Sequence, residues 1–149
     1  MRVARVFAVT IATAGILSAV LLATAEQGKP ATYKGLEITP LSVARAQNVA
    51  LLDCPPGTNT QRGNAREGEE FAVVTLSFKV TPAFKETIVK KPVMTDASGR
   101  VFNTSVAIID PGSKPEYVCA FPFRVPTGTR VTSVAIDTAT IALAALEKK

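Results

Sequence analysis

The two cysteines, Cys54 and Cys119, are the side chains best suited to covalent chemistry. In a chain that enters an oxidising compartment, two cysteines are expected to form one intramolecular disulfide. A disulfide that closes a loop of this span stabilises a fold by about 4 kcal/mol in the loop-entropy model. Two free thiols or a redox site are the alternatives, but redox pairs normally show a close Cys-x-x-Cys spacing, which is missing here. We therefore predict a structural disulfide.

Carboxylates are the second candidates for chemistry, because paired carboxylates can perform acid–base catalysis. Glu67, Glu69 and Glu70 are clustered at the start of a predicted strand, a position that favours side chains in solvent. Asp96 and Asp110 could bind calcium only if several further oxygen ligands converged on them, and each is better explained by its turn. We predict no catalytic residue, no metal ligand and no cofactor. An enzyme that uses carboxylates, or Lys with Ser or Thr, is the alternative.

The residues that the chain lacks exclude several classes of protein. It contains no histidine, which rules out Ser-His-Asp and Cys-His catalytic sites and the histidine-based copper and zinc sites. Neither a Gly-x-Gly-x-x-Gly nor a Walker sequence is present, which removes the common nucleotide-binding folds. Asn103-Thr104-Ser105 matches the N-glycosylation motif, which matters only in a pathway that glycosylates.

Residues 1–25 have the pattern of an export signal. A short basic region and an uncharged apolar run over residues 6–22 precede Ala23-Thr24-Ala25. A signal peptidase reads small residues at these positions, so we predict cleavage between Ala25 and Glu26. An uncleaved membrane anchor is the alternative, because the apolar run is about as long as the ~20 residues that span a bilayer. The sequence therefore predicts a secreted or periplasmic protein, in contact with a membrane only if the signal is retained.

The charge of the mature chain does not favour nucleic acid as a partner. Arg2 and Arg5 lie in the signal, so 17 basic residues become 15 against 12 acidic residues, a net charge of +3. Nucleic-acid binding needs basic residues clustered on one face. The densest basic group is interpreted as a solvated face whose lysines guard a sheet edge. This group consists of Lys79, Lys85, Lys90 and Lys91.

The segment Glu70–Val80 predicts the central strand of the domain. Val74, Leu76, Phe78 and Val80 alternate with polar residues, as a half-buried strand requires. No Pro or Gly interrupts the segment, which favours an interior position in a sheet.

The rest of the mature chain is expected to form one domain over residues 33–149, after a flexible polar lead over residues 26–32. Pro40 is expected to place the first strand at an edge or at a switch between sheets. Residues 53–68 form a long polar loop, rooted at Cys54. We expect further strands over residues 33–43, 87–95, 100–109, 117–125, 130–137 and 138–146.

Two stretches leave alternatives open: residues 44–52 fit either an extended chain or a short helical turn, and residues 141–149 fit either a strand or a short helix. About seven short strands at spacings near ten residues, with turns between them, indicate an all-β, immunoglobulin-like antiparallel β-sandwich. Tyr117, Cys119 and Phe121 fall on one face of their strand, so Cys119 is expected to point into the core.

Several strand and turn sequences carry a resemblance to a known group. They are Gly-Leu-Glu-Ile-Thr from residue 35, Gly-Glu-Glu-Phe-Ala-Val-Val-Thr-Leu at 68–76, Asp-Ala-Ser-Gly-Arg-Val-Phe at 96–102, Asp-Pro-Gly-Ser-Lys at 110–114 and Phe-Pro-Phe-Arg-Val-Pro at 121–126. The chain from residue 33 to 143 resembles the immunoglobulin-like domains of unknown function in bacterial secreted proteins and lipoproteins, including the immunoprotective extracellular protein type. The resemblance implies a fold, and it brings no active site.

These observations favour an exported, non-catalytic binding or interaction module of the bacterial cell envelope or exterior. A rigid sandwich would display its loops, chiefly residues 53–68, to a partner protein, a cell-wall polymer or a small ligand. An exposed sheet edge could also recruit a partner strand. A structural, membrane-tethered envelope protein is the alternative from another class. A concave pocket would favour a ligand carrier, and a protruding loop surface would favour protein partners.

Overall fold

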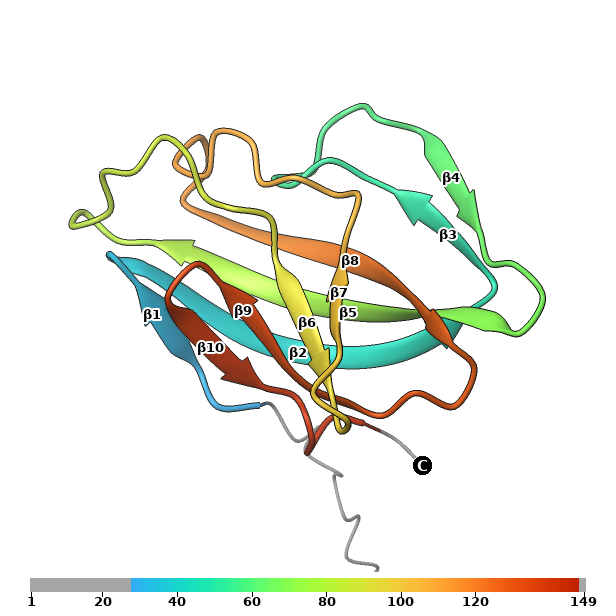
Figure 1. Ribbon diagram of the computed structural model, residues 1–149. Helices are drawn as coiled ribbons and strands as arrows, with labels where there is room; N and C mark the ends of the chain where they lie inside the picture. Colours follow the sequence, from blue (N-terminus) through green and yellow to red (C-terminus); the bar gives the residue numbers. More distant parts are fainter. Residues whose placement is uncertain (1–27, 148–149) are drawn as a thin grey trace, which may run out of the picture.

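The computed structural model describes residues 28–147, which form ten strands and no helix. Two four-stranded antiparallel sheets pack face to face around one core, so the predicted all-β sandwich is confirmed (Figure 1). The first sheet has the order β1 (Ala31–Tyr33), β2 (Leu36–Ala46), β5 (Glu69–Val80), β8 (Glu116–Pro126). The second has the order β10 (Ala139–Ala142), β9 (Val131–Ile136), β6 (Val93–Asp96), β7 (Val101–Asn103). The side hairpin consists of β3 (Asn48–Leu51) and β4 (Gln61–Asn64).

The predicted central strand is confirmed as β5, which pairs antiparallel with β2 on one side and with β8 on the other. Val74, Leu76 and Phe78 are fully buried, because alternate residues of a strand point to the same side of its sheet. Ala72 also lies in the core, and Val80 packs against it. The residues between them in the alternation, Phe71, Val73, Thr75, Ser77 and Lys79, lie on the outer face of the first sheet.

Strand β8 supplies the densest part of the core. Tyr117, Cys119, Phe121, Phe123 and Val125 are all buried, as their alternation predicts. The Phe78 ring stacks on Tyr117 with ring centroids 5.0 Å apart and meets the edge of Phe121 at 6.1 Å. The predicted disulfide is present: Cys119 is bonded to Cys54, with their Cα atoms 5.5 Å apart. It therefore fastens the segment after β3 to the middle of β8.

Pro40 lies inside β2 at a point where that strand is paired only with β5, so it stands at a local edge of the sheet, as predicted. The pairing of β2 with β5 shifts register between Pro40 and Ser42, which marks a β-bulge. Strand β1 pairs with β2 only as far as Ile38, so Pro40 lies beyond the end of that neighbour. A proline without an amide donor is tolerated there because β1 no longer needs one.

The segment predicted as a long polar loop, residues 53–68, contains strand β4. Residues 61–64 pair with β3, and the predicted loop is therefore shorter than its composition suggested. The open alternative for residues 44–52 is settled as extended chain, because β2 runs to Ala46 and β3 begins at Asn48. Ala65 N donates to Gln47 O at 2.8 Å and closes the base of the side hairpin.

The second sheet is built from shorter strands than predicted. Residues 87–95 contribute β6, which begins only at Val93, and residues 100–109 contribute β7, which ends at Asn103. Beyond these strands the chain makes isolated bridges, which pair Ile88 with Ile109 and Cys54 with Ile108. Pro92 explains why β6 begins only at Val93, because proline has no amide donor for regular pairing.

The ends of the described chain also differ from expectation. Strand β1 begins at Ala31, inside the segment predicted as a flexible lead, and Gly28 N already donates to Pro40 O. Residues 26 and 27, the signal segment and its cleavage site lie outside the described residues. At the other end the chain forms strand β10 and then a single turn at Leu143–Leu146, so within residues 141–147 the strand alternative holds to Ala142 and no helix forms.

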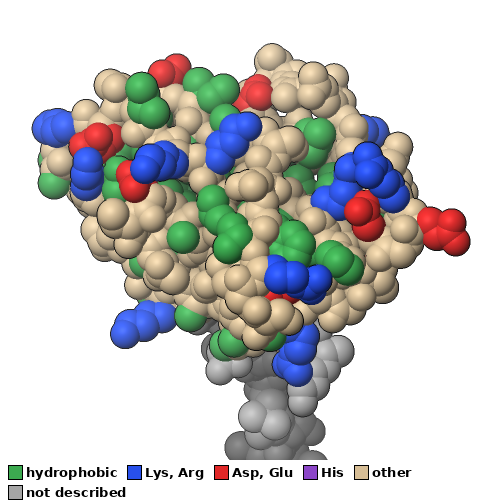
Figure 2. Space-filling model, viewed as in Figure 1, with side chains coloured by type: hydrophobic (Ala, Val, Ile, Leu, Met, Phe, Trp, Pro, Cys, Tyr) green, Lys and Arg blue, Asp and Glu red, His purple; other side chains and the backbone are tan. Residues whose placement is uncertain are grey.

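Both open sides of the sandwich are bridged by contacts between the sheets. On the β1 side, the Tyr33 hydroxyl donates to Asp137 Oδ2. On the β8 side, Thr104 forms a bridge to Phe123. Four-stranded sheets normally protect their edges from pairing with other chains, and these contacts serve that purpose. The outer face of the second sheet carries small and uncharged side chains, and Figure 2 shows charged groups mainly around its rim.

Candidate functional site

The side hairpin folds over one end of the outer face of the first sheet. Phe71 lies on that face and yet is only 5% exposed. Gly63 of β4 lies directly against its ring, because a Cβ atom added to this glycine would come within 3.2 Å of Phe71 Cζ. The absence of a side chain at position 63 therefore allows the hairpin to approach the sheet.

A hollow of about 550 Å³ lies between the side hairpin, β8 and the chain that leaves β7. We call it the hairpin hollow. Its size is within the range of pockets that hold small molecules, about 300–1,000 Å³. Apolar and polar side chains both line it, and they come from Leu51, Arg62, Gly63, Asn64, Phe71, Asn103, Ser105, Pro122 and Arg124.

Arg124 is held in place at the wall of the hairpin hollow by three contacts. Its Nη2 donates to Asn64 O at 2.9 Å, and its Nε lies 3.7 Å from Glu69 Oε2. The guanidinium carbon also lies 5.3 Å from the centre of the Phe71 ring, a distance suited to a cation–π contact. The side chain remains 41% exposed, so a fixed guanidinium faces solvent and the hollow.

Arg62 contributes a second guanidinium to the hairpin hollow from strand β4, and it is exposed. No aspartate or glutamate is among the lining residues. Of the predicted loop at 53–68, Arg62, Gly63 and Asn64 therefore belong to the hollow, whereas Phe71 and Arg124 were missed. One signal pointed to Phe71: it falls on the mostly polar side of the central strand, where a buried aromatic side chain needs to be covered.

The tip of the predicted loop lies beside smaller hollows. Asn59 N donates to Asp53 Oδ2, and Lys114 Nζ donates to Pro56 O at 3.0 Å. A shallow space of about 280 Å³ lies between residues 53–57 and 109–114. Ile109 is 58% exposed at its margin. This part of the chain is held by its own contacts and offers less enclosed space than the hairpin hollow.

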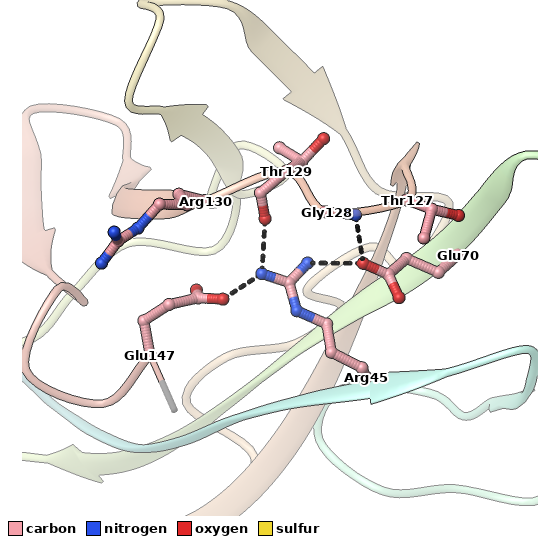
Figure 3. A pocket seen from close by; sticks show the side chains of 7 residues that line it. All are labelled: Arg45, Glu70, Thr127, Gly128, Thr129, Arg130 and Glu147. Carbon is pink, nitrogen blue, oxygen red and sulfur yellow. Dashed lines mark hydrogen bonds and ion pairs between the residues drawn. The ribbon is translucent and has the colours of Figure 1, made fainter. Parts of the chain in front are cut away.

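A further hollow of about 440 Å³, shown in Figure 3, is occupied by an ion-pair network centred on Arg45. Arg45 Nη2 donates to Thr129 O at 2.6 Å and also contacts Glu147 Oε1. Arg45 Nη1 lies 3.5 Å from Glu70 Oε1, which accepts a hydrogen bond from Gly128 N. The charged groups thus bind one another, and they join β2 and β5 to the β8–β9 turn and the end of the described chain.

The three glutamates predicted to lie in solvent, Glu67, Glu69 and Glu70, have different surroundings. Glu67 is exposed, as predicted, but the Glu70 side chain is only 14% exposed within the Arg45 network. Glu69 is 31% exposed and faces Arg124. The prediction was wrong for Glu70 because its partner, Arg45, is distant in sequence and reaches it only through the pairing of β2 with β5.

Asp96 and Asp110 lie in turns, as predicted. Asp96 accepts hydrogen bonds from Ser98 N, Arg100 N and Arg100 Nε. Burial raises the pKa of Asp96, but the hydrogen bonds from Arg100 and Ser98 outweigh burial and hold it below its usual value. Asp110 has a positive φ of 48° and accepts a hydrogen bond from Ser113 N. Within residues 28–147, no three His, Cys, Asp or Glu side chains gather as a metal site would require.

The lysines of the densest basic group are all exposed, but they do not line one sheet edge. Lys79 lies on the interior strand β5, opposite Glu37 and Glu116 of the neighbouring strands. Lys90 Nζ lies 3.6 Å from Asp137 Oδ1. Acidic neighbours thus accompany these two basic residues, and the predicted edge-guarding role does not apply to Lys79.

Comparison with known proteins places few constraints on this chain. No protein family matches the sequence, and no curated protein matches it either. An uncharacterized β-sandwich protein from Clostridium difficile 630 is similar in structure, with a TM-score of 0.45 and 11% sequence identity. The match covers 74% of this chain and 83% of that chain. Among residues 28–147 we find no helix with the length and hydropathy of a membrane span.

Proposed function

We propose that this protein is an exported, non-catalytic binding module of the bacterial cell envelope or exterior, and that the hairpin hollow is its recognition site. The main support for this proposal is the hollow itself. One of its walls is the β3–β4 hairpin, which pairs with neither of the two sheets of the sandwich. An additional hairpin that encloses mixed apolar and polar side chains is the arrangement expected of a binding site.

The walls of the hollow are fixed before any partner arrives. Ala65 N and Gln47 O close the hairpin at its base, and the disulfide from Cys54 fastens the chain after β3. Arg124 ties β8 to Asn64 of β4. Binding to a fixed surface loses less conformational entropy than binding that must order loops, so this rigidity favours recognition.

The strand order supports an immunoglobulin-like type of sandwich. Strands β2, β5 and β8 lie side by side in one sheet, and β7, β6, β9 and β10 do so in the other. These neighbours correspond to strands A, B and E and to strands C′, C, F and G of immunoglobulin-like domains. The disulfide departs from that type, because it joins β8 to the segment after β3 and does not link the two sheets.

Export is supported by the buried disulfide together with the signal-like sequence of residues 1–25. The start of β1 lies at the lower side of Figure 1 and the side hairpin lies at the upper side. If the signal were retained as a membrane tether, the hairpin would therefore face away from the point of attachment. A secreted or periplasmic module and a tethered one can both present the same site.

The proposal is tested by site-specific crosslinking in exporting cells. A photoreactive amino acid replaces Ser105 at the hollow, and in a matched control it replaces Thr140, which is exposed on β10. We expect a discrete adduct from position 105 and none from position 140. Equal labelling at both positions, or no adduct at position 105, would contradict a recognition role for the hollow.

A further inference from the structure

The hairpin hollow also indicates the chemistry of its ligand, an inference that rests on the proposed function. We propose that the hollow binds the carboxylate group of a ligand whose adjoining part is aliphatic. The two guanidinium groups, Arg62 and Arg124, receive the carboxylate, and the apolar side chains of Leu51 and Pro122 contact the aliphatic part.

The donors of Arg124 are available and oriented. A guanidinium is planar and has five N–H donors, and contacts with Asn64, Glu69 and Phe71 fix the orientation of Arg124's plane. Within residues 28–147, Asn64 O is the one acceptor that hydrogen-bonds this guanidinium. Its Nη1 donors make no hydrogen bond to the described residues. Paired donors on one guanidinium match the two oxygens of a carboxylate.

Arg62 adds a second positive charge on the facing strand, and it makes no ion pair with another residue of the described chain. Asn103 and Ser105 line the same space with neutral polar groups. These side chains can hydrogen-bond the polar atoms next to a carboxylate but would not neutralise it. The hollow therefore combines positive charge, neutral donors and an apolar wall.

The charge balance favours a singly charged ligand over a phosphate. Glu69 lies beside Arg124 with its Oε2 atom 3.7 Å from Nε, so one of the two positive charges is already partly compensated. A dianion would lie close to this carboxylate and be repelled by it. A monoanionic carboxylate matches the single net positive charge that remains.

The experiment is an NMR titration of the exported, disulfide-bonded protein labelled with ¹⁵N. The probes are 4-methylpentanoate, its neutral amide 4-methylpentanamide, and inorganic phosphate. We expect saturable shifts of the backbone amides of Arg62–Asn64, Asn103 and Ser105 with the carboxylate. The amide and phosphate are expected to bind at least about 10-fold more weakly, because charge-assisted hydrogen bonds are the strong ones.

Charge variants test whether binding depends on the arginines of the hollow or only on the overall positive charge of the protein. Arg62→Gln is expected to weaken carboxylate binding by about 10-fold. Arg66→Gln removes the same charge from an exposed arginine outside the hollow and is expected to leave binding unchanged. Arg124→Lys keeps the charge but loses the planar pair of donors, and we expect it to weaken binding as well.

Three results would overturn the inference: equal binding of the amide, equal or tighter binding of phosphate, or shifts confined to residues outside the hollow. An equal loss in Arg62→Gln and Arg66→Gln would also overturn it. The crosslinking at Ser105 distinguishes the two proposals. An adduct there without carboxylate binding would leave the recognition site in place and reject only the ligand chemistry.

Discussion

Tyr33 and Asp137 join the two sheets: the Tyr33 hydroxyl of β1 donates a 2.8 Å hydrogen bond to Asp137 Oδ2 in the turn between β9 and β10. The hydrogen bond from Tyr33 holds the pKa of Asp137 below its usual value, and the same bond raises the pKa of Tyr33. Asp137 also lies near Lys90, whose positive charge acts on it in the same direction.

The stabilising effect of this pair should depend on pH at both ends of the scale. A lowered aspartate pKa stabilises the fold above the ordinary value of 3.8, and this contribution is lost as the pH falls through the folded pKa. A raised tyrosine pKa stabilises below the ordinary value of 10.0, and this contribution is lost as the pH rises through the folded pKa. We expect Tyr33→Phe to lower the free energy of unfolding most at pH values between 3.8 and 10.0.

Urea unfolding of the wild type and Tyr33→Phe, at pH values below, between and above 3.8 and 10.0, measures this effect. The difference between the two proteins should shrink at both extremes. A difference that stays constant across the series would show that the hydroxyl acts through packing and not through Asp137.

Gly35 and Gly99 provide a matched test of backbone packing. Both have positive φ values, +88° and +81°, but a Cβ at Gly35 would lie 2.6 Å from Phe84 N, whereas one at Gly99 would meet nothing within 4 Å. Gly99→Ala should therefore cost about 1–2 kcal/mol, the cost of the left-handed conformation alone. Gly35→Ala should cost at least about 1 kcal/mol more, because the backbone must also move. Thermal or urea unfolding checks the order, and equal losses would contradict it.

Removal of the disulfide should destabilise the domain strongly. Cys54 and Cys119 are 65 residues apart and both are buried. We expect reduction to lower the free energy of unfolding by about 4 kcal/mol through the entropy of the unfolded chain. Urea unfolding with and without a reductant measures the change. A loss below about 1 kcal/mol would mean that the reduced chain keeps this loop closed by other contacts.

Loss of Arg45 should affect stability far more than loss of an exposed charge. Glu70 and Glu147, only 14% and 10% exposed, would be left without their cation in Arg45→Met. We expect a loss of about 1–3 kcal/mol, between the values for surface and buried ion pairs. Lys34→Met, which removes an exposed partner of Glu86, serves as the control and should change little. Similar losses in the two variants would show that the Arg45 network is not specially stabilising.

The predicted processing of the N-terminus is checked by intact mass. The protein exported by its own host should begin at Glu26, weigh two mass units less than the fully reduced chain, and react with a thiol reagent only after reduction. A full-length, membrane-bound species with both thiols reactive would contradict the export prediction. Residues 1–25 could then act as an anchor, the alternative that the sequence left open.

The sandwich was largely predictable because its signals are local. The alternation in β5 and in Tyr117–Val125 is visible in any short window of the sequence, and both strands were assigned correctly. Strand β4 carries no such alternation, since Gln61–Asn64 is polar throughout. It is a strand because it pairs with β3 and because Gly63 packs on Phe71, and both contacts depend on the tertiary fold.

The candidate site could not be assembled from the sequence for a related reason. Arg62 and Arg124 are far apart in the chain, and they line one hollow only because β8 lies beside β5 and the hairpin folds back over Phe71. The sequence singled out the loop at 53–68, and three of its residues, Arg62, Gly63 and Asn64, line the hollow. Its composition drew attention to prolines and glycines near Cys54, whereas the enclosed space lies at the polar residues that follow.

The closed base of the side hairpin suggests how this domain could diversify. Because Gln47 and Ala65 are hydrogen-bonded to each other, the chain leaves β2 and returns toward β5 at one point. The segment between them also contains Cys54, so an insert must keep a cysteine there if the disulfide to Cys119 is to form. With that cysteine kept, the rest of the hairpin can change in length and sequence while the sandwich serves as a constant frame, and the tip of a hairpin from another protein could be grafted there to give a new specificity.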